Sequence, residues 1–210
     1  MATNIEVSRA EEIGPLVKKH GVALWRGLVP ETVTQEFIDP VFKNVGDKSR
    51  YISRHYGVLT MEILPPDLKL KAFSAIGEVT AKVLSACTVY SGEIYITAPG
   101  FIPHEWHQDA NRPIDENHLF SWTAITPCGV EQPGLTFALG NPGQFLGGKP
   151  QAAERAQDLE HVTPHFMPGD TVFFDLFSLH KTHTTEAMKY NRIAYKVCAR
   201  QIPVGQAVQD

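Results

Sequence analysis

The stretch "HEWHQDANRP", residues 104–113, concentrates side chains that bind metal ions or transfer protons. Its first six residues contain two histidines, two carboxylates and a tryptophan. His107 and Asp109 lie two positions apart, and side chains so spaced on a strand point to the same side. An imidazole and a carboxylate would then reach one point in space. With a second histidine from elsewhere, they would form the two-histidine, one-carboxylate facial triad that holds non-haem iron.

A second polar segment follows much later, in "PGDTVFFDLFSLHKTHTTEAMKYNRIA" at residues 168–194. The Pro-Gly-Asp turn is expected to start a strand that ends at His180, and another strand is expected to begin at Arg192. This pair predicts a metal ligand beside an anion site, because a guanidinium group binds a carboxylate through two hydrogen bonds. His183 is a rival third ligand, closer to Arg192 but out of register with the turn.

The elements that must position these residues are mostly short β-type runs separated by glycine and proline. The expected strands cover residues 21–28, 92–98, 119–126, 135–139, 171–177 and 192–202. Strands and helices do not alternate regularly, which argues against a doubly wound parallel sheet. The sequence predicts a mainly β fold with flanking helices, built as a jelly roll or similar double sheet. Its 210 residues suit one domain, 1–210.

Three helices are expected to flank this β core. The clearest covers residues 67–87, where apolar side chains recur at intervals of three and four: Leu70, Phe73, Ile76, Val79, Val83 and Leu84. An earlier helix opens at Pro30, and Pro40 should kink or end it. A third is expected within "QAAERAQDLE", residues 151–160.

Composition excludes several classes of partner. The formal charge of −4 provides no field that would attract nucleic acid or anionic lipid. No apolar run reaches the length of a membrane span, and the N-terminal segment lacks the pattern of a signal peptide. The three cysteines, Cys87, Cys128 and Cys198, are widely spaced and odd in number, which indicates reduced core thiols. We therefore expect a soluble, cytoplasmic protein.

Four patches, in order, resemble the phytanoyl-CoA dioxygenase family of Fe(II)- and 2-oxoglutarate-dependent oxygenases. They are "HEWHQD", "SWTA" at 121–124, "PGDTVFFDLFSLH" and "NRIA" at 191–194. The resemblance implies a double-stranded β-helix, a cupin-like jelly roll. It implies that Fe(II) is bound by His107, Asp109 and His180. For the co-substrate 2-oxoglutarate, it implies binding by Arg192, with the Thr182 hydroxyl beside the same carboxylate and Trp122 lining the pocket.

The resemblance also implies a reaction. O2 and 2-oxoglutarate would be converted to succinate and CO2 while a small-molecule substrate is oxidised. The carboxylate of Asp109 favours hydroxylation over halogenation, because halogenating relatives have a small residue there. Arg112, Arg54 and His55 are candidates for substrate contact, the last two within a basic cluster that also holds Lys48 and Arg50. The chain is short for the family, so we expect a small lid or one completed by a second subunit of a homo-oligomer.

Other interpretations use the same residues. Glu105 also lies two positions from His107, but fits the ligand position only if the motif is reversed. A zinc hydrolase or cupin-type metalloenzyme could use the same triad without 2-oxoglutarate. A binding protein with a degenerate site is a third class. The zinc interpretation leaves Arg192 unexplained, and the degenerate one is opposed by the presence of a full ligand set.

Overall fold

The computed structural model describes residues 3–45, 57–60, 64–98, 104–114, 117–140 and 142–202. Its elements in chain order are β1 (Glu6–Val7), the 3-10 helix η1 (Ala10–Glu12), α1 (Ile13–His20), β2 (Ala23–Trp25), α2 (Glu31–Val45), β3 (Gly57–Thr60), α4 (Pro66–Leu84), β4 (Cys87–Thr97), β5 (His118–Ala124), β6 (Gly134–Leu139), α5 (Lys149–Gln157), β7 (Glu160–Val162), β8 (Thr171–Phe174), β9 (His180–His183) and β10 (Arg192–Gln201).

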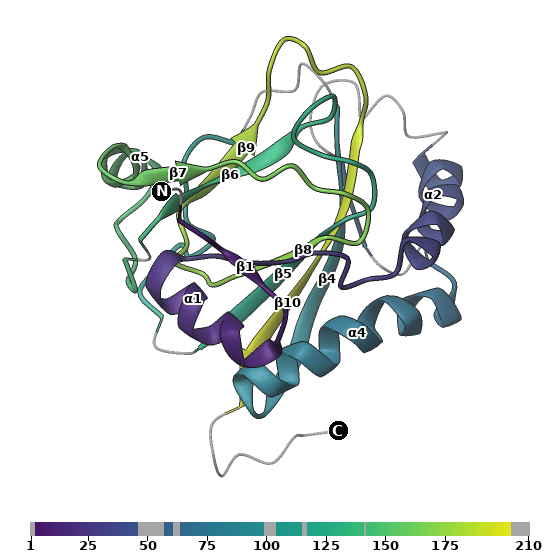
Figure 1. Cartoon of the computed structure of the whole chain (residues 1–210), viewed down its shortest axis with the longest axis horizontal. Coiled ribbons are helices and arrows are strands. Elements are labelled where there is room, and N and C mark those ends of the chain that lie inside the picture. The colour runs from purple at the N-terminus through teal and green to yellow at the C-terminus, as the bar shows by residue number, and fades with distance from the viewer. Residues whose placement is uncertain are drawn as a thin grey trace.

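The strands form two sheets that face each other. The larger has the order β1-β2-β8-β5-β10-β4-β3, and the smaller has the order β7-β6-β9. Neighbouring strands are antiparallel except for the parallel pair β1–β2. Helices α1 and α4 cross the face of the larger sheet that points away from the smaller one (Figure 1). This arrangement confirms the predicted mainly β fold with flanking helices.

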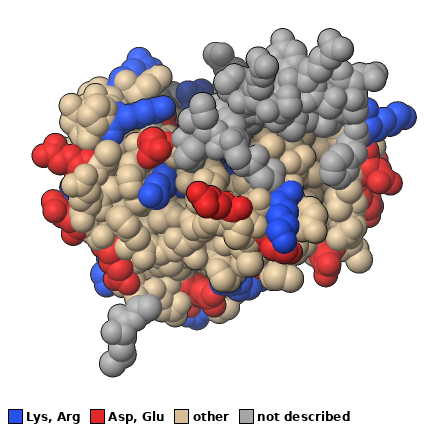
Figure 2. Space-filling view, turned by 90° about the horizontal axis from the view of Figure 1, so that it is seen from above, with Lys and Arg blue, Asp and Glu red and all other residues tan. Residues whose placement is uncertain are grey.

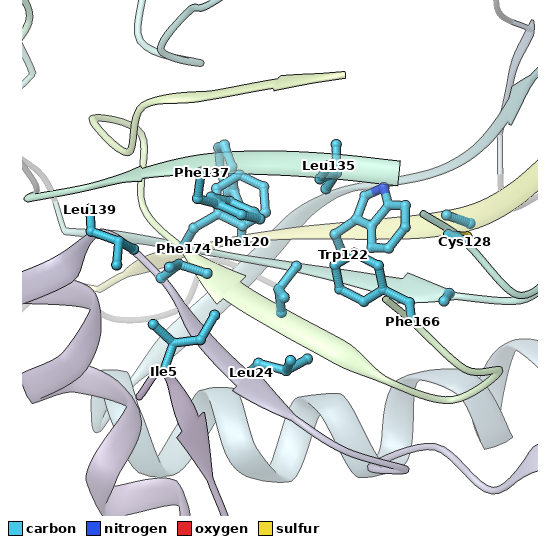
Figure 3. Close-up of a cluster of buried hydrophobic side chains, with 14 of the residues drawn as sticks. Ile5, Leu24, Phe120, Trp122, Cys128, Leu135, Phe137, Leu139, Phe166 and Phe174 are labelled. Atoms are coloured by element: carbon cyan, nitrogen blue, oxygen red, sulfur yellow. The ribbon is translucent and has the colours of Figure 1, made fainter. Parts of the chain in front are cut away.

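Apolar side chains fill the space between the sheets. Phe120 and Trp122 of β5 and Phe174 of β8 meet Leu135 and Phe137 of β6 (Figure 3). Successive residues of a strand point to opposite faces, so the even-numbered residues of β10, which begins at 192, point toward this same interior. The space between the sheets is therefore an aromatic core into which one strand can send polar side chains.

A second apolar layer joins the larger sheet to its helices. Phe37 and Val41 of α2 and Ile76 of α4 pack in one cluster with Ile94 of β4 and Tyr195 of β10. Burial of a large apolar side chain contributes roughly 1.5–3 kcal/mol. The odd-numbered residues of β10 thus fix the sheet to the helices, and this leaves the opposite face of the strand for the site.

The expected helices are present, although α4 ends at Leu84 and not at the predicted residue 87. In α4, Ile76, Val79 and Leu84 are buried as predicted, but Leu70 is 72% exposed, so its place on the buried stripe was wrong. Helix α2 continues through Pro40 to Val45 and does not end there. A proline removes one helical hydrogen bond. Burial of Phe37 and Val41 on either side outweighs that loss.

The strand predicted from the Pro-Gly-Asp turn to His180 was wrong: it is two strands in different sheets. Strand β8 ends at Phe174, and His180 begins β9. Between them Asp175 accepts a hydrogen bond from the Phe177 amide at 2.9 Å, and the Ser178 hydroxyl bonds the Gly21 carbonyl at 2.6 Å. Such side-chain bonds to the backbone stabilise turns, so the chain crosses from the larger sheet to the smaller one here.

The Pro-Gly-Asp turn itself is fixed by backbone geometry and charge. Gly169 has φ of +91°, and a Cβ there would lie 2.0 Å from the Val29 carbonyl oxygen, so only glycine fits. The Asp170 carboxylate accepts hydrogen bonds from the Gly27 and Met167 amides and pairs with Arg26 at 2.7 Å. The turn therefore connects β8 firmly to the segment that follows β2.

The surface carries mixed charges. Figure 2 shows acidic and basic side chains interspersed over one face of the described residues. No helix among these residues has the length and apolar character that crossing a membrane requires. Cys128 and Cys198 are buried and Cys87 is half-buried, all as free thiols, close to the prediction of reduced core cysteines.

Candidate metal centre

The structure brings His107, Asp109 and His180 to one point. Their potential ligand atoms all lie within 4.8 Å of one another. The Nε2 atoms of His107 and His180 lie 3.8 Å and 3.9 Å from Oδ1 of Asp109. These spacings suit three atoms arranged around a single cation. The described part of the chain holds no second group of three such side chains.

Backbone pairing places the two histidines side by side. His107 and His180 exchange N–H···O bonds of 3.0 Å and 3.1 Å as an isolated antiparallel bridge. His107 and Asp109 thus lie in a loop rather than on the strand that the i, i+2 argument assumed. Their side chains converge because one bridge to β9 fixes the loop at His107.

Each imidazole is oriented by its other ring nitrogen. Nδ1 of His107 bonds the Glu105 carbonyl oxygen at 2.8 Å, and Nδ1 of His180 bonds the Ser178 carbonyl oxygen at 3.1 Å. A carbonyl oxygen can only accept, so each Nδ1 carries the proton and each Nε2 presents its lone pair to the centre. This is the arrangement of metal-binding histidines whose second nitrogen is held by an outer group.

The protonation states also suit a cation. Burial, followed by the neighbouring His180, lowers the pKa of His107 to about 4, and burial lowers the pKa of His180. Burial alone would raise the pKa of Asp109, but the charge of Lys196 and the nearby histidines hold that pKa at about 2. At neutral pH the centre therefore holds two neutral imidazoles and one carboxylate, the states in which these groups bind metal.

We expect the metal-free protein to lose stability as the pH falls from 6.5 toward 4. Below its ordinary pKa of 6.5, His107 takes up a proton in the unfolded chain, whereas the pKa of about 4 keeps the folded residue neutral. Protons then favour the unfolded state, and His107 alone accounts for a loss of about 3 kcal/mol in the free energy of unfolding. Urea titrations of chelator-treated protein across this pH range measure the effect. A His107→Gln variant should show a shallower dependence, and a wild-type curve that is flat would contradict the assignment.

Residues beside the triad fix the loop. The Gln108 amide group donates to the carbonyl oxygens of Gln144 and Phe177 at 2.9 Å and 2.8 Å, and its oxygen accepts from the Leu146 amide at 2.9 Å. Trp106 is buried between the ring of His161, at 4.8 Å, and Nζ of Lys181, at 4.9 Å. Gln108 and Trp106 therefore position their neighbour His107. Gln108 was not predicted, because its partners lie far from it along the chain.

Lys196 reaches the centre from the middle of β10. Its Nζ lies 2.6 Å from Oδ2 of Asp109. Burial alone would lower the pKa of Lys196, but the charge of Asp109 raises it above the ordinary value, so the pair is ionised. Lys196 lies four residues after Arg192 on β10, so both side chains leave the same face of the strand. The structure adds its partner, which no local pattern indicates.

Arg192 is a buried cation without a carboxylate partner among the described residues. It is 4% exposed, and its two terminal nitrogens donate to the Gly134 carbonyl at 2.9 Å and the Thr97 hydroxyl at 2.7 Å. Its Nε has no hydrogen-bond partner in the part of the chain that the structure describes. Burial lowers the pKa of Arg192 to about 10, still well above neutrality. A buried charge normally has a counterion, so the arrangement indicates an anion site.

One cavity of about 300 Å³ connects the triad with Arg192. Its walls are formed by the triad, Arg192, Lys196 and eight further residues: Tyr95, Thr97, His104, Trp122, Leu135, Lys149, Phe174 and Thr182. The predicted residues Trp122 and Thr182 therefore both line it, and the Trp122 ring lies 5.4 Å from the Arg192 guanidinium carbon. The Trp122 side chain serves at once as core and as pocket wall.

Thr97 was missed by sequence analysis. Strand β10 pairs with β4 so that Arg192 lies directly opposite Thr97. The hydroxyl that contacts Arg192 is therefore that of Thr97, while Thr182 lines the cavity without a hydrogen bond to the guanidinium. Only the register of two strands distant in sequence could have shown this.

Other predicted residues lie elsewhere. His183 is half-buried on β9 and does not belong to the triad. Arg112 is exposed and does not line the cavity. Arg54 and His55, with Lys48 and Arg50, fall outside the described residues, so their role stays a prediction. His104 lines the cavity beside His107, with ring centroids 5.5 Å apart.

No protein-family model matches this sequence, and no curated protein matches it. Solved structures of non-haem oxygenases do share its fold. The carbocyclase SnoK of nogalamycin biosynthesis, described as α-ketoglutarate-dependent, superposes with a TM-score of 0.73 at 18% identity over 92% of this chain and 86% of that one. EvdO2 from Micromonospora carbonacea var. aurantiaca, complexed with 2-oxoglutarate, superposes with a TM-score of 0.70 at 16% identity over 99% of this chain and 97% of that one.

EctD from S. alaskensis, crystallised with 2-oxoglutarate and 5-hydroxyectoine, gives a TM-score of 0.74 at 14% identity over 96% of this chain and 79% of that one. At such low identity the likeness establishes the fold alone, which is a jelly roll. Membership of the phytanoyl-CoA dioxygenase family stays a prediction.

Proposed function

We propose that this protein is an Fe(II)- and 2-oxoglutarate-dependent oxygenase that oxidises a small-molecule substrate, with hydroxylation as the reaction. The observation that carries the proposal is that Arg192 is buried, has no carboxylate partner among the described residues, and lies in the same cavity as His107, Asp109 and His180. A metal site alone needs no such cation. A metal site with an anion receptor inside one cavity suits a co-substrate that binds through both of its ends.

The charges of the cavity support a dianionic co-substrate. Asp109 contributes one negative charge, and Lys149, Lys196 and Arg192 contribute three positive charges. A divalent cation bound by the triad would leave a net charge of about +4 in a cavity with low effective dielectric constant. The two carboxylates of 2-oxoglutarate would reduce it to about +2. Metal and co-substrate should therefore strengthen the binding of each other.

Different residues of the cavity would bind the metal and the co-substrate. His107, Asp109 and His180 would hold iron, which supplies the redox chemistry that activates O2. Arg192 would bind the far carboxylate of 2-oxoglutarate, with the unpartnered Nε as a further donor and the Thr97 hydroxyl beside it. Trp122, Leu135 and Phe174 would exclude water from the carbon chain between the two ends.

The structural neighbours support the class and leave the reaction open. They include a carbocyclase, an epimerase and a protein crystallised with 5-hydroxyectoine, so one fold carries several reactions. We propose hydroxylation because Asp109 retains the carboxylate ligand. Substrate contacts of Arg112, Arg54 and His55, and a role for Thr182 at the co-substrate, remain proposals at residue level.

Anaerobic titration tests the proposal. Addition of Fe(II) and 2-oxoglutarate to the purified protein should produce a weak visible charge-transfer band, because the keto acid accepts charge from ferrous iron that it chelates. Admission of O2 should then yield succinate, and a metabolite screen for faster succinate formation would reveal the substrate. His107→Ala and Arg192→Ala should lose the band. A zinc hydrolase or a binding protein would give no band, and an unchanged band in both variants would overturn the site assignment.

A further inference from the structure

Lys196 divides the two oxygens of Asp109 between itself and the metal centre. Oδ1 faces the Nε2 atoms of His107 and His180 at 3.8 Å and 3.9 Å, while Oδ2 lies 2.6 Å from Nζ of Lys196. We propose that Lys196 is a positioning residue that reserves Oδ2, so that Asp109 binds the metal through one oxygen and is neutralised when no metal is bound. This inference rests on the proposed function.

The ion pair is enclosed by the fold. The side chains of Lys196 and Asp109 are 13% and 19% exposed, and Nζ lies 4.4 Å from the ring centroid of Phe120 and 5.9 Å from that of Phe174. Eighty-seven residues separate the partners in sequence. An ammonium group held among aromatic rings loses most of its hydration, a cost that only a close counterion offsets. The ammonium group of Lys196 is therefore expected to stay paired with the Asp109 carboxylate.

The register of the sheet fixes the direction of this lysine. In β10 Lys196 lies opposite Trp122 of β5 and Glu93 of β4, in the strand interior where the backbone cannot shift. The rings of Phe120 and Phe174 lie beside its ammonium group. The lysine holds Oδ2 while Oδ1 faces the histidines, and the carboxylate cannot rotate without breaking the pair.

Lys196 should lower the affinity for metal and raise turnover. A divalent cation must share Asp109 with an ammonium group, so Lys196 weakens metal binding through charge repulsion. A carboxylate held at Oδ2 also cannot bind through both oxygens, which preserves a coordination position that substrates of a facial triad need. Loss of Lys196 should therefore tighten the metal and slow turnover. A variant that only damaged packing would lose both metal affinity and turnover.

The test compares Lys196→Met with Lys189→Met. Lys189 is exposed between β9 and β10 and does not line the cavity, so its variant removes an equal charge without touching Asp109. In chelator-treated Lys196→Met the unfolding midpoint should fall by on the order of 10 °C, because Asp109 becomes a buried unpaired charge. Its affinity for Co(II) should rise by on the order of tenfold, and bound Co(II) should recover most of the lost midpoint. Lys189→Met should bind Co(II) like the wild type.

Turnover gives a separate measurement. Succinate formation by iron-loaded Lys196→Met should fall although the metal binds more tightly, and the visible d–d spectrum of its Co(II) form should change as the second carboxylate oxygen enters. Equal or weaker Co(II) binding than the wild type would overturn the role of Lys196 while leaving the oxygenase proposal intact. If the wild-type protein bound neither Co(II) nor Fe(II), both proposals would fail together.

Discussion

Replacement of Arg192 by methionine should abolish 2-oxoglutarate binding and at the same time make the ligand-free protein more stable. The guanidinium group is the buried cation without a carboxylate partner in the described structure, and its removal deletes the charge-assisted hydrogen bonds to the co-substrate. Truncation of such a buried charge partner costs 2–5 kcal/mol or more in binding, so affinity for 2-oxoglutarate should fall by about 100-fold or more.

The stability effect has the opposite sign because no carboxylate among the described residues balances the buried charge before the ligand binds. Burial lowers the pKa of Arg192 from 12.5 to about 10, which corresponds to a cost of about 3 kcal/mol at neutral pH. Methionine avoids that cost but leaves the Gly134 carbonyl and the Thr97 hydroxyl without their donor, at about 1 kcal/mol each. A net gain of about 1 kcal/mol is expected in the free energy of unfolding.

Calorimetric titration with 2-oxoglutarate and urea unfolding measure the two effects. The matched control is Arg200→Met, which removes the same side chain from the exposed end of the same strand. It should leave co-substrate affinity unchanged. An Arg192→Met protein that still binds 2-oxoglutarate with wild-type affinity would remove the observation on which the proposed function depends.

Loss of His180 should abolish iron binding, whereas loss of His183 should not. His180 is buried and contributes Nε2 to the triad, while His183 lies three residues further on β9 and outside it. Substitution of groups that merely orient metal ligands costs 10- to 100-fold in affinity, so removal of a ligand should cost about 100-fold or more. His180→Ala and His183→Ala form a matched pair, because the two histidines lie three residues apart on the same short strand.

Equilibrium dialysis against Fe(II) or Co(II) decides between the two histidines. His180→Ala should retain its fold, because the backbone bonds between residues 107 and 180 do not depend on the side chain. Near-wild-type metal affinity in His180→Ala, together with loss in His183→Ala, would assign the third ligand to His183 instead.

Several features were predictable because their causes are local. The spacing of apolar residues placed α4, and the short runs of β-branched and aromatic residues placed β5, β6 and β10. The residue types of His107 and Asp109 indicated a metal site, although the strand assumed to carry them is a loop. Leu70 was misplaced because a helical period gives the apolar stripe, but not where the partner surface ends.

The crossing between the sheets was not predictable from apolar pattern alone. The run from residue 171 to His180 has the apolar and aromatic composition of one strand. It nevertheless divides into two strands at the turn of Asp175 and Ser178. The Ser178 hydroxyl reaches Gly21, far away in the sequence, so the bond that stabilises this turn exists only once β2 and β8 have paired. This crossing is what brings His180 opposite His107.

The sequence by itself determined the kinds of group available. These are two histidines, a carboxylate, an arginine, and a lysine four residues after that arginine. Only the tertiary structure decided their partners. Thr97 meets Arg192 and Lys196 meets Asp109 through strand register and a loop bridge, and neither contact has any signal in local spacing. The physical reason is that charge and hydrogen-bonding capacity belong to each residue, whereas the distance between two residues far apart in the chain is set by the packing of everything between them.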